Sequence, residues 1–297
     1  MGAAPANKAG AAGRPLENVS LVVPVLNEAE SIPKFLKALD SALKPSASSV
    51  VTEVLFVDDG SKDGTREALR SYASMPHDFD VRIVERDQAR GPANAEIVGC
   101  QLASNPWVSK MDVDGQHPLE ALRRVTAAAS QDVDVVVASR YTREGVNDWS
   151  PFRGVISRSA LLLSQLLIPA ARRTTDPVSG FFMVRRHLAD GLDPSIAKYK
   201  MLLYVLAKHP NARLREVPFR MGDRRAGRSK IVIRPDVYIP NFLEELLRYG
   251  QITRNDAQLL RFEKSSELPR SHARTPRVPA QGYPAGGAFN EGMSARD

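Results

Sequence analysis

The first half of the chain alternates between segments with helical spacing and short apolar runs. Helical spacing of apolar residues marks residues 32–43, 65–72, 93–103 and 119–129. The apolar runs cover residues 19–25, 54–57, 81–84, 108–111 and 133–139. Apolar strands separated by helices are typical of a parallel sheet that is covered on both faces. The pattern therefore predicts an α/β fold, in which ligands bind beyond the carboxyl ends of the strands.

Charged side chains stand at the ends of four of the five predicted strands, where ligands are expected. The first strand leads to Glu28, the second to Asp58 and Asp59, the fourth to Asp112 and Asp114, and the fifth to Arg140. Because parallel strands end at a common edge, these side chains are expected to lie close together. A sheet with a purely structural role does not require such a gathering.

Asp112 and Asp114 form the most informative pair. At positions i and i+2 of an extended segment, their carboxylates point the same way and repel each other. A hard divalent cation, which takes oxygen ligands, removes that repulsion, and Gln116 adds an amide oxygen in the same phase. The alternative for an isolated pair is a turn with solvated aspartates before Pro118. The position of the pair after an apolar run favours a metal site.

The other acids allow two interpretations each. Asp58 and Asp59 either open a turn and cap the next helix, or accept hydrogen bonds from a base or a ribose. Glu28 is either a first-turn helix acid or a ribose ligand. Asp176, which precedes a proline, is a candidate general base, and a turn acid is its alternative.

Three motifs in this order resemble an inverting glycosyltransferase of family 2, with the GT-A fold. They are VPVLNE (23–28), DDGSKDGT (58–65) and DVDGQHP (112–118). In the second half, SRY (139–141), Arg153 with Ser157, DPVSGFF (176–182) and GDRRAGRSK (222–230) are similar to dolichyl-phosphate (polyprenyl-phosphate) mannosyltransferases. The resemblance covers about residues 19–235. It implies a Rossmann-like, mostly parallel sheet flanked by helices, with an acceptor-side extension.

The resemblance also implies roles for individual residues. Asp114 and Arg140 would be catalytic, and Asp112, Asp114 and Gln116 would hold Mg²⁺ or Mn²⁺ on the donor diphosphate. The acceptor phosphate would meet Arg153, Ser157, Arg224 and Lys230. Leu26 stands where the family often has an aromatic side chain. The nucleotide sugar would contact Pro24, Leu26, Glu28, Val57, Asp58, Asp59, Asp112, Val113, Asp114, Arg140, Arg224 and Lys230.

The implied reaction moves mannose from GDP-mannose to a polyprenyl or dolichyl phosphate at a membrane surface. A phosphate monoester with a second pKa of about 6 is largely deprotonated at neutral pH, so a strong general base is unnecessary. One alternative is a family 2 enzyme that uses a UDP-sugar, such as UDP-glucose, and a polyprenyl-phosphate or hydroxyl acceptor. A remote alternative is a non-catalytic module that binds a nucleotide or nucleic acid.

The charge distribution helps to choose between these partners. The formal net charge is +7, but residues 18–139 carry 12 basic and 18 acidic groups, whereas residues 140–234 carry 19 and 7. Arginine-rich surroundings suit phosphate oxygens. The chain has no recognised nucleic-acid motif and no aromatic residues interleaved with its basic ones. We therefore expect a phosphorylated acceptor in the second half, and no nucleic-acid partner.

The same composition predicts the domain organisation. We expect a disordered leader (1–17), a GT-A catalytic domain (18–235), a C-terminal helical segment (236–263) and a disordered tail (264–297). Within the domain, residues 18–139 form the nucleotide and metal half and residues 140–235 the acceptor half. A single cysteine, Cys100, excludes an internal disulfide framework.

Membrane contact is expected to be peripheral. The most hydrophobic uncharged run, residues 159–171, is shorter than the about 20 residues that a spanning helix needs. Residues 1–17 lack the apolar core of a secretory signal. We predict a cytoplasmic protein that associates with the cytoplasmic face of a membrane, directly or through a separate membrane-anchoring protein. Residues 156–168 and 231–247 are interpreted as helices that pack in the core or lie on the bilayer.

Overall fold

The computed structural model describes residues 18–44, 50–88, 90–142, 151–222 and 235–266. Contacts divide the chain into a first compact unit, residues 1–258, and a second unit, residues 259–297. The predicted nucleotide and acceptor halves both lie in the first unit, and their division stays a prediction about function. The predicted leader, and the tail beyond residue 266, lie outside the described residues.

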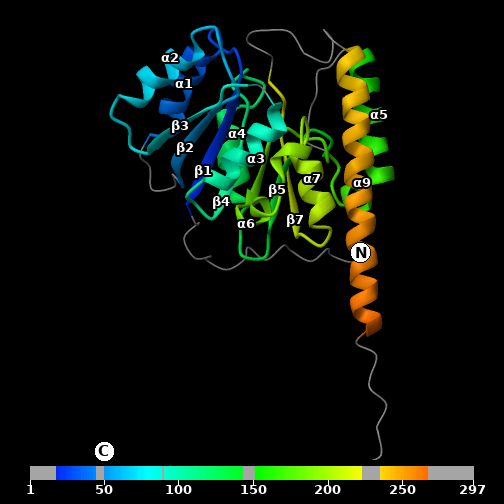
Figure 1. The fold of residues 1–297 in the computed structure, drawn as a ribbon. Helices are drawn as coiled ribbons and strands as arrows, with labels where there is room; N and C mark the ends of the chain where they lie inside the picture. Colours follow the sequence, from blue (N-terminus) through cyan, green and yellow to red (C-terminus); the bar gives the residue numbers. More distant parts are fainter. Residues whose placement is uncertain (1–17, 45–49, 89, 143–150, 223–234, 267–297) are drawn as a thin grey trace, which may run out of the picture. The chain divides into compact units, whose positions relative to one another are not determined.

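A seven-stranded sheet forms the centre of the first unit, with the strand order β3-β2-β1-β4-β6-β5-β7 (Figure 1). Every neighbouring pair is parallel except those of β6, which runs antiparallel to both β4 and β5. The strands are β1 (Val19–Val25), β2 (Val51–Asp58), β3 (Asp80–Glu85), β4 (Trp107–Lys110), β5 (Val135–Ser139), β6 (Phe182–Arg185) and β7 (Leu214–Pro218). This arrangement confirms the predicted α/β fold with a mostly parallel sheet.

Helices cover both faces of the sheet, because residues along each strand alternate between two hydrophobic clusters. In β1, Leu21 and Val23 belong to one cluster and Val22 to the other. The helices are α1 (Ile32–Ala42), α2 (Thr65–Ala73), α3 (Pro92–Leu102), α4 (Leu119–Ala127), α5 (Pro151–Leu167), α6 (His187–Asp190), α7 (Met201–Lys208) and α9 (Pro235–Ser266), with the short 3₁₀ helices η1 (Pro169–Arg173) and η2 (Pro194–Ile196).

Helix α3 lies unusually close to the sheet, which fixes its position above β1 and β2. A Cβ atom on Gly99 would lie 2.5 Å from Val22 Cγ1 and 3.0 Å from Val57 Cγ2. Glycine therefore permits an approach that any side chain would prevent. Cys100, the next residue, is fully buried, as expected for a cysteine that acts as a small apolar side chain.

The C-terminal segment contains one long helix, α9, whose first part packs on the body of the first unit. Phe242, Leu246 and Tyr249 are buried in the same cluster as α7, and Tyr249 stacks on Tyr204 with ring centroids 5.0 Å apart. Within the described residues, no helix is long and apolar enough to cross a bilayer.

Candidate active site

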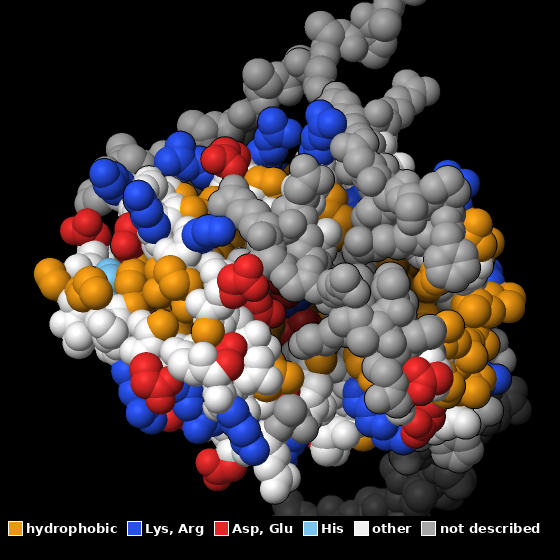
Figure 2. All heavy atoms as spheres, turned by 90° about the horizontal axis from the view of Figure 1, so that it is seen from above, with side chains coloured by type: hydrophobic (Ala, Val, Ile, Leu, Met, Phe, Trp, Pro, Cys, Tyr) orange, Lys and Arg blue, Asp and Glu red, His pale blue; other side chains and the backbone are white. Residues whose placement is uncertain are grey.

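A cavity of about 620 Å³ opens at the edge of the sheet where β1 and β4 end. Figure 2 looks onto this side of the molecule and shows acidic side chains around a central hollow. One part of the wall is charged and the other is apolar. Among the predicted site residues, those that line the cavity are Pro24, Leu26, Glu28, Asp59, Asp112, Val113, Asp114, Gln116, Arg140 and Ser157.

The remaining predicted residues do not reach this cavity or fall outside the described part of the chain. Val57 is buried in the hydrophobic core, and Asp58 is buried beneath the turn that follows β2. The side chain of Arg153, and all of Arg224 and Lys230, lie outside the described residues. Their predicted contacts with phosphate stay predictions.

Asp58 closes the turn after β2, which is the structural alternative left open for it. The amide of Ser61 donates to both carboxylate oxygens, at 3.2 and 3.1 Å. Arg66 Nε donates to Oδ2 at 2.5 Å, so the buried carboxylate is also charge-paired. Asp58 therefore shapes the loop that carries its neighbour.

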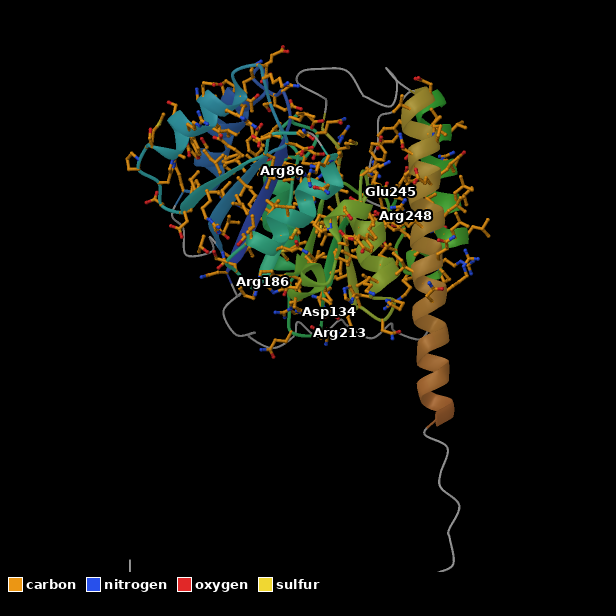
Figure 3. All side chains as sticks on the ribbon, viewed as in Figure 1. Arg86, Asp134, Arg186, Arg213, Glu245 and Arg248 are labelled. Atoms are coloured by element: carbon orange, nitrogen blue, oxygen red, sulfur yellow. The ribbon has the colours of Figure 1, made fainter. Side chains whose placement is uncertain are left out.

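Asp59 faces the cavity and has one carboxylate oxygen to offer. Its Oδ2 accepts hydrogen bonds of 3.0 Å from the amides of Arg90 and Gly91. Its Oδ1 lies 3.4 Å from Arg86 Nη1, and neither atom has a hydrogen-bond partner among the described residues (Figure 3 labels Arg86). Burial raises the pKa of Asp59. Such an oxygen suits a base N–H or a ribose hydroxyl.

Asp112 lies in the cavity wall and is held by a lysine. Lys110 Nζ donates to Oδ1 at 2.7 Å, and the Asp112 side chain remains 39% exposed. Burial tends to raise the pKa of Asp112, but the Lys110 ammonium outweighs burial and holds that pKa well below its usual range. Asp112 is therefore an anion in the absence of any metal ion.

Asp114 and Gln116 complete the predicted metal-binding motif. Asp114 Oδ1 accepts a hydrogen bond of 2.9 Å from the Gln116 amide, across a turn in which Gly115 has φ 82°. Gly222 donates to the Gln116 carbonyl at 3.0 Å, and a Cβ on Gly222 would lie 2.8 Å from the Gly115 carbonyl oxygen. The loop that carries Asp114 and Gln116 is therefore held by a hydrogen bond within it and by its close contact with Gly222.

These residues fit a divalent cation whose coordination is completed by a ligand. Carboxylate and amide oxygens are the donors that Mg²⁺ and Mn²⁺ prefer. Among the described residues, no three His, Cys, Asp or Glu side chains converge on one point. Two carboxylates with phosphate oxygens as further ligands are a common Mg²⁺ arrangement.

His117 follows this motif and acts as a packing residue. Its ring stacks on Phe181 with centroids 5.2 Å apart and meets Phe219 edge-on. Its Nδ1 accepts a hydrogen bond of 2.9 Å from the Asp112 amide. Burial lowers the pKa of His117 to about 4, so the imidazole is neutral at physiological pH.

Arg140 is positioned by Asp176 through a two-point ion pair. Asp176 accepts from Arg140 Nε and Nη2, both at 2.7 Å, and from the Arg140 amide at 3.2 Å. Asp176 is fully buried and both of its oxygens are engaged. The structure therefore favours a structural acid over the general base considered for Asp176. Its effect is to fix the Arg140 guanidinium in the cavity wall.

Sequence reasoning missed two buried lysines in the wall, Lys110 and Lys200. Lys200 Nζ donates to the Val178 carbonyl at 3.0 Å. Burial, together with repulsion from Arg140 and Lys110, lowers the pKa of Lys200 to about 8. Lys110 stands inside a run interpreted as an apolar strand, and a lysine in such a run could have indicated a buried charge near the site. Lys200 had no such signal, because it precedes an ordinary apolar helix.

The apolar part of the wall comes from α5, α7 and α9. Ile156 and Ala160 of α5 line it, together with Tyr238, Ile239 and Phe242 of α9. Tyr238 and Tyr199 pack with ring centroids 4.3 Å apart. One cavity therefore joins a charged part of the wall to an apolar part that includes the two helices for which bilayer contact was considered.

Comparisons with known proteins identify relatives of this chain. The sequence model for "Glycosyl transferase family 2" matches residues 20–192. A dolichol-phosphate mannosyltransferase from Pyrococcus furiosus is 32% identical over 214 residues, which are 72% of this chain and 59% of that protein. A dolichol-phosphate mannosyltransferase from Mycosarcoma maydis is 33% identical over 221 residues, 71% of this chain and 73% of that protein.

A solved structure supports the fold. Glucosyl-3-phosphoglycerate synthase from Mycobacterium tuberculosis, in complex with Mn²⁺, UDP and glucosyl-3-phosphoglycerate, aligns with a TM-score of 0.59 at 19% identity. The alignment covers 79% of this chain and 80% of that one. The chain spans 59% of the length of the Pyrococcus relative. The family resemblance expected from the motifs is confirmed, and the chain belongs to glycosyl transferase family 2.

Proposed function

We propose that this protein transfers mannose from GDP-mannose to a polyprenyl or dolichyl phosphate at a membrane surface. The observation that carries the proposal is the single cavity in which acids and cations adjoin an apolar wall. A nucleotide sugar needs the charged part of the wall, and the prenyl chain of the acceptor needs the apolar part. The names of the two curated relatives support the choice of sugar and acceptor.

The donor is assigned to the side of the cavity formed after β1, β2 and β4. Asp59 offers its Oδ1 to the nucleoside, and Pro24, Leu26 and Glu28 lie along the same wall. Asp112, Asp114 and Gln116 would hold Mg²⁺ or Mn²⁺ there. Such an ion stabilises the negative charge that develops on the leaving diphosphate.

The acceptor phosphate is assigned to the cationic side. Arg140 and Lys200 line the cavity, and Ser157 is placed there by a hydrogen bond of 2.8 Å with the Tyr141 hydroxyl. Arg153, Arg224 and Lys230 are proposed to add further contacts. Because the acceptor phosphate is already an anion at neutral pH, the cations need only orient it for attack on the sugar. No protein base is assigned.

Membrane contact is supported by the exposed faces of α5 and α9. Of the ten large hydrophobic side chains that are exposed in the described part of the chain, eight belong to these helices. Figure 2 shows hydrophobic side chains gathered on the side where α5 and α9 lie in Figure 1. Exposed apolar clusters commonly mark membrane or protein contacts. The eight residues are Val155, Leu162, Leu163, Leu166, Val237, Ile239, Leu243 and Leu247.

A donor panel tests the reaction. Purified full-length protein is incubated with Mg²⁺ or Mn²⁺, a polyprenyl phosphate, and GDP-mannose, UDP-glucose or other nucleotide sugars. We expect mannosyl transfer from GDP-mannose that stops with EDTA and does not occur when the unphosphorylated polyprenol replaces the acceptor. Exclusive use of a UDP-sugar would overturn the donor assignment, and transfer to the free polyprenol would overturn the acceptor assignment.

Vesicle flotation tests the membrane surface. We expect the wild type to float with vesicles that contain anionic phospholipid, and Leu162→Glu with Leu166→Glu to abolish flotation. Met75→Glu is the matched control, because Met75 is also an exposed hydrophobic side chain but follows α2. Wild-type protein that remains unbound would favour attachment through a separate membrane protein, at a cytoplasmic membrane face, over direct binding.

A further inference from the structure

A buried ion pair lies directly behind the proposed metal ligand Asp112. Lys110 is the last residue of β4, and its Nζ lies 2.7 Å from Asp112 Oδ1 and 3.0 Å from Glu96 Oε1. Lys110 and Glu96 are both almost completely buried. All three residues line the cavity, and one ammonium joins the almost completely buried carboxylate of Glu96 to the partly exposed carboxylate of Asp112.

Two rigid elements fix this ammonium in place. Lys110 pairs with Val22 of β1 on one side and with Phe182 of β6 on the other, so its backbone is held in the middle of the sheet. Glu96 belongs to α3, which approaches the sheet closely at Gly99. A lysine between two packed elements has little freedom to turn away from Asp112 when a ligand enters.

The charges show what the arrangement adds. In its ionised form Glu96 offsets the charge of Lys110, and the three groups together then carry the same net charge as Asp112 would carry alone. The pair therefore leaves the total unchanged and adds a directed N–H···O bond to one oxygen of Asp112. Charge-assisted hydrogen bonds of this kind are short and strong.

Fold stability alone is a weak explanation for this pair. Buried ion pairs often contribute no more stability than apolar side chains of similar volume. The third member, Asp112, is 39% exposed on the cavity side, so the bond from Lys110 ends at the surface where ligands bind. Its position suits an effect on ligand binding.

We propose that Lys110 is a positioning residue that holds Asp112 Oδ1 and competes with the divalent cation for this carboxylate. The proposal rests on the proposed function only in taking Asp112 as a metal ligand. As a consequence, the free protein holds the cation weakly until a nucleoside diphosphate supplies further oxygen ligands. The cation and the donor therefore bind together.

Electron paramagnetic resonance of free Mn²⁺ tests this directly. The full chain is titrated with Mn²⁺ alone, and again with GDP or UDP. The informative variant is Glu96→Gln with Lys110→Met, which frees Asp112 from the lysine and does not leave Glu96 as a buried carboxylate without its partner. We expect Mn²⁺ alone to bind the double variant about tenfold more tightly than the wild type. The added benefit of the nucleotide should shrink accordingly.

Two controls isolate the contact with Asp112. Lys200→Met removes a cation from the same wall, but Lys200 donates to Val178 rather than to Asp112, so a smaller effect is expected. In an Asp112→Asn background, the double substitution should leave the affinity for Mn²⁺ with nucleotide unchanged. Circular dichroism and thermal melting establish that each variant is folded.

Three results would overturn the proposal. They are an unchanged Mn²⁺ affinity in the folded double variant, an equal gain in Lys200→Met, and a gain that persists without the Asp112 carboxylate. None of these measurements involves a sugar or an acceptor. Failure of mannosyl transfer in the donor panel would therefore refute the proposed function and leave this inference standing, and the converse also holds.

Discussion

Two acidic pairs follow β2 and β4, the strands on either side of β1, and they differ in what they offer to a ligand. Asp58 and Asp59 are adjacent, and side chains of adjacent extended residues point to opposite sides. Only Asp59 reaches the cavity, while Asp58 is buried in its turn. Asp112 and Asp114 are two residues apart, and both line the cavity. Spacing, more than composition, separates a structural acid from a binding acid.

The largest effect is expected for a substitution of Asp114, which tests whether the second pair binds the metal. Asp114→Asn preserves an acceptor for the Gln116 amide but removes a metal-binding carboxylate. We expect kcat/KM for sugar transfer to fall by about 100- to 1000-fold, as for the loss of one transition-state contact. Thermal melting should match that of the wild type. Near-normal transfer by the variant would contradict the assignment of this pair to the metal.

The first acid of the other pair should behave in the opposite way. Asp58→Asn leaves Arg66 without its charge partner and weakens the turn. We expect the free energy of unfolding in urea to fall by about 3 kcal/mol. The donor KM of the protein that remains folded should change little. A stable variant with a strongly raised donor KM would show instead that Asp58 binds the nucleotide.

A smaller effect is expected at Asp59, where the comparison can be sharpened. Asp59→Asn keeps one oxygen for the amides of Arg90 and Gly91 and removes the charge next to Arg86. Calorimetry should show about tenfold weaker binding of GDP or UDP. The KM for the acceptor serves as the internal control. A change in the KM for the acceptor alone would place Asp59 on the acceptor side of the cavity instead.

The smallest predicted effect concerns Lys200 and pH. Since its pKa is lowered to about 8, Lys200 is mostly neutral just above pH 8. A bound phosphate favours the ammonium, so binding of a short-chain polyprenyl phosphate should take up protons there, and the uptake should disappear in Lys200→Met. Calorimetry in two buffers with different ionisation enthalpies measures it. Equal uptake by the variant would exclude Lys200. The charged groups that face Lys200 are Arg140, Lys110, Glu96 and Asp112.

Apolar runs predicted β1 to β5. Strands β1, β2, β4 and β5 are almost entirely buried, which gives continuous apolar runs, whereas β3 is an edge strand that is only partly buried. Strand β6 was not predicted, since Phe182–Arg185 is short and has no period that separates it from a loop. Its antiparallel direction depends on pairing with β4 and β5, which are distant in sequence. Such a strand follows from tertiary context.

The candidate site was predicted where motif and strand end coincide, as at Asp112, Asp114 and Arg140. Long-range pairs were not predictable. The bond between Arg140 and Asp176 joins residues 36 positions apart, and the one between Lys110 and Glu96 depends on how α3 packs on the sheet. Local patterns carry no information on such partners, because the partners meet only when the sheet is assembled.

Glu245 ties the surface helix α9 to the cavity through the protein backbone (Figure 3). Its Oε1 accepts from the amides of Lys198 and Tyr199, immediately before Lys200. The Lys198 carbonyl in turn lies against Gly91, whose amide donates to Asp59. If α9 lies on a bilayer as proposed, a displacement of this helix would pass through Glu245 to the backbone next to Lys200 and Asp59. Under the proposed function, sugar transfer should then respond to the tension of the membrane as well as to its presence.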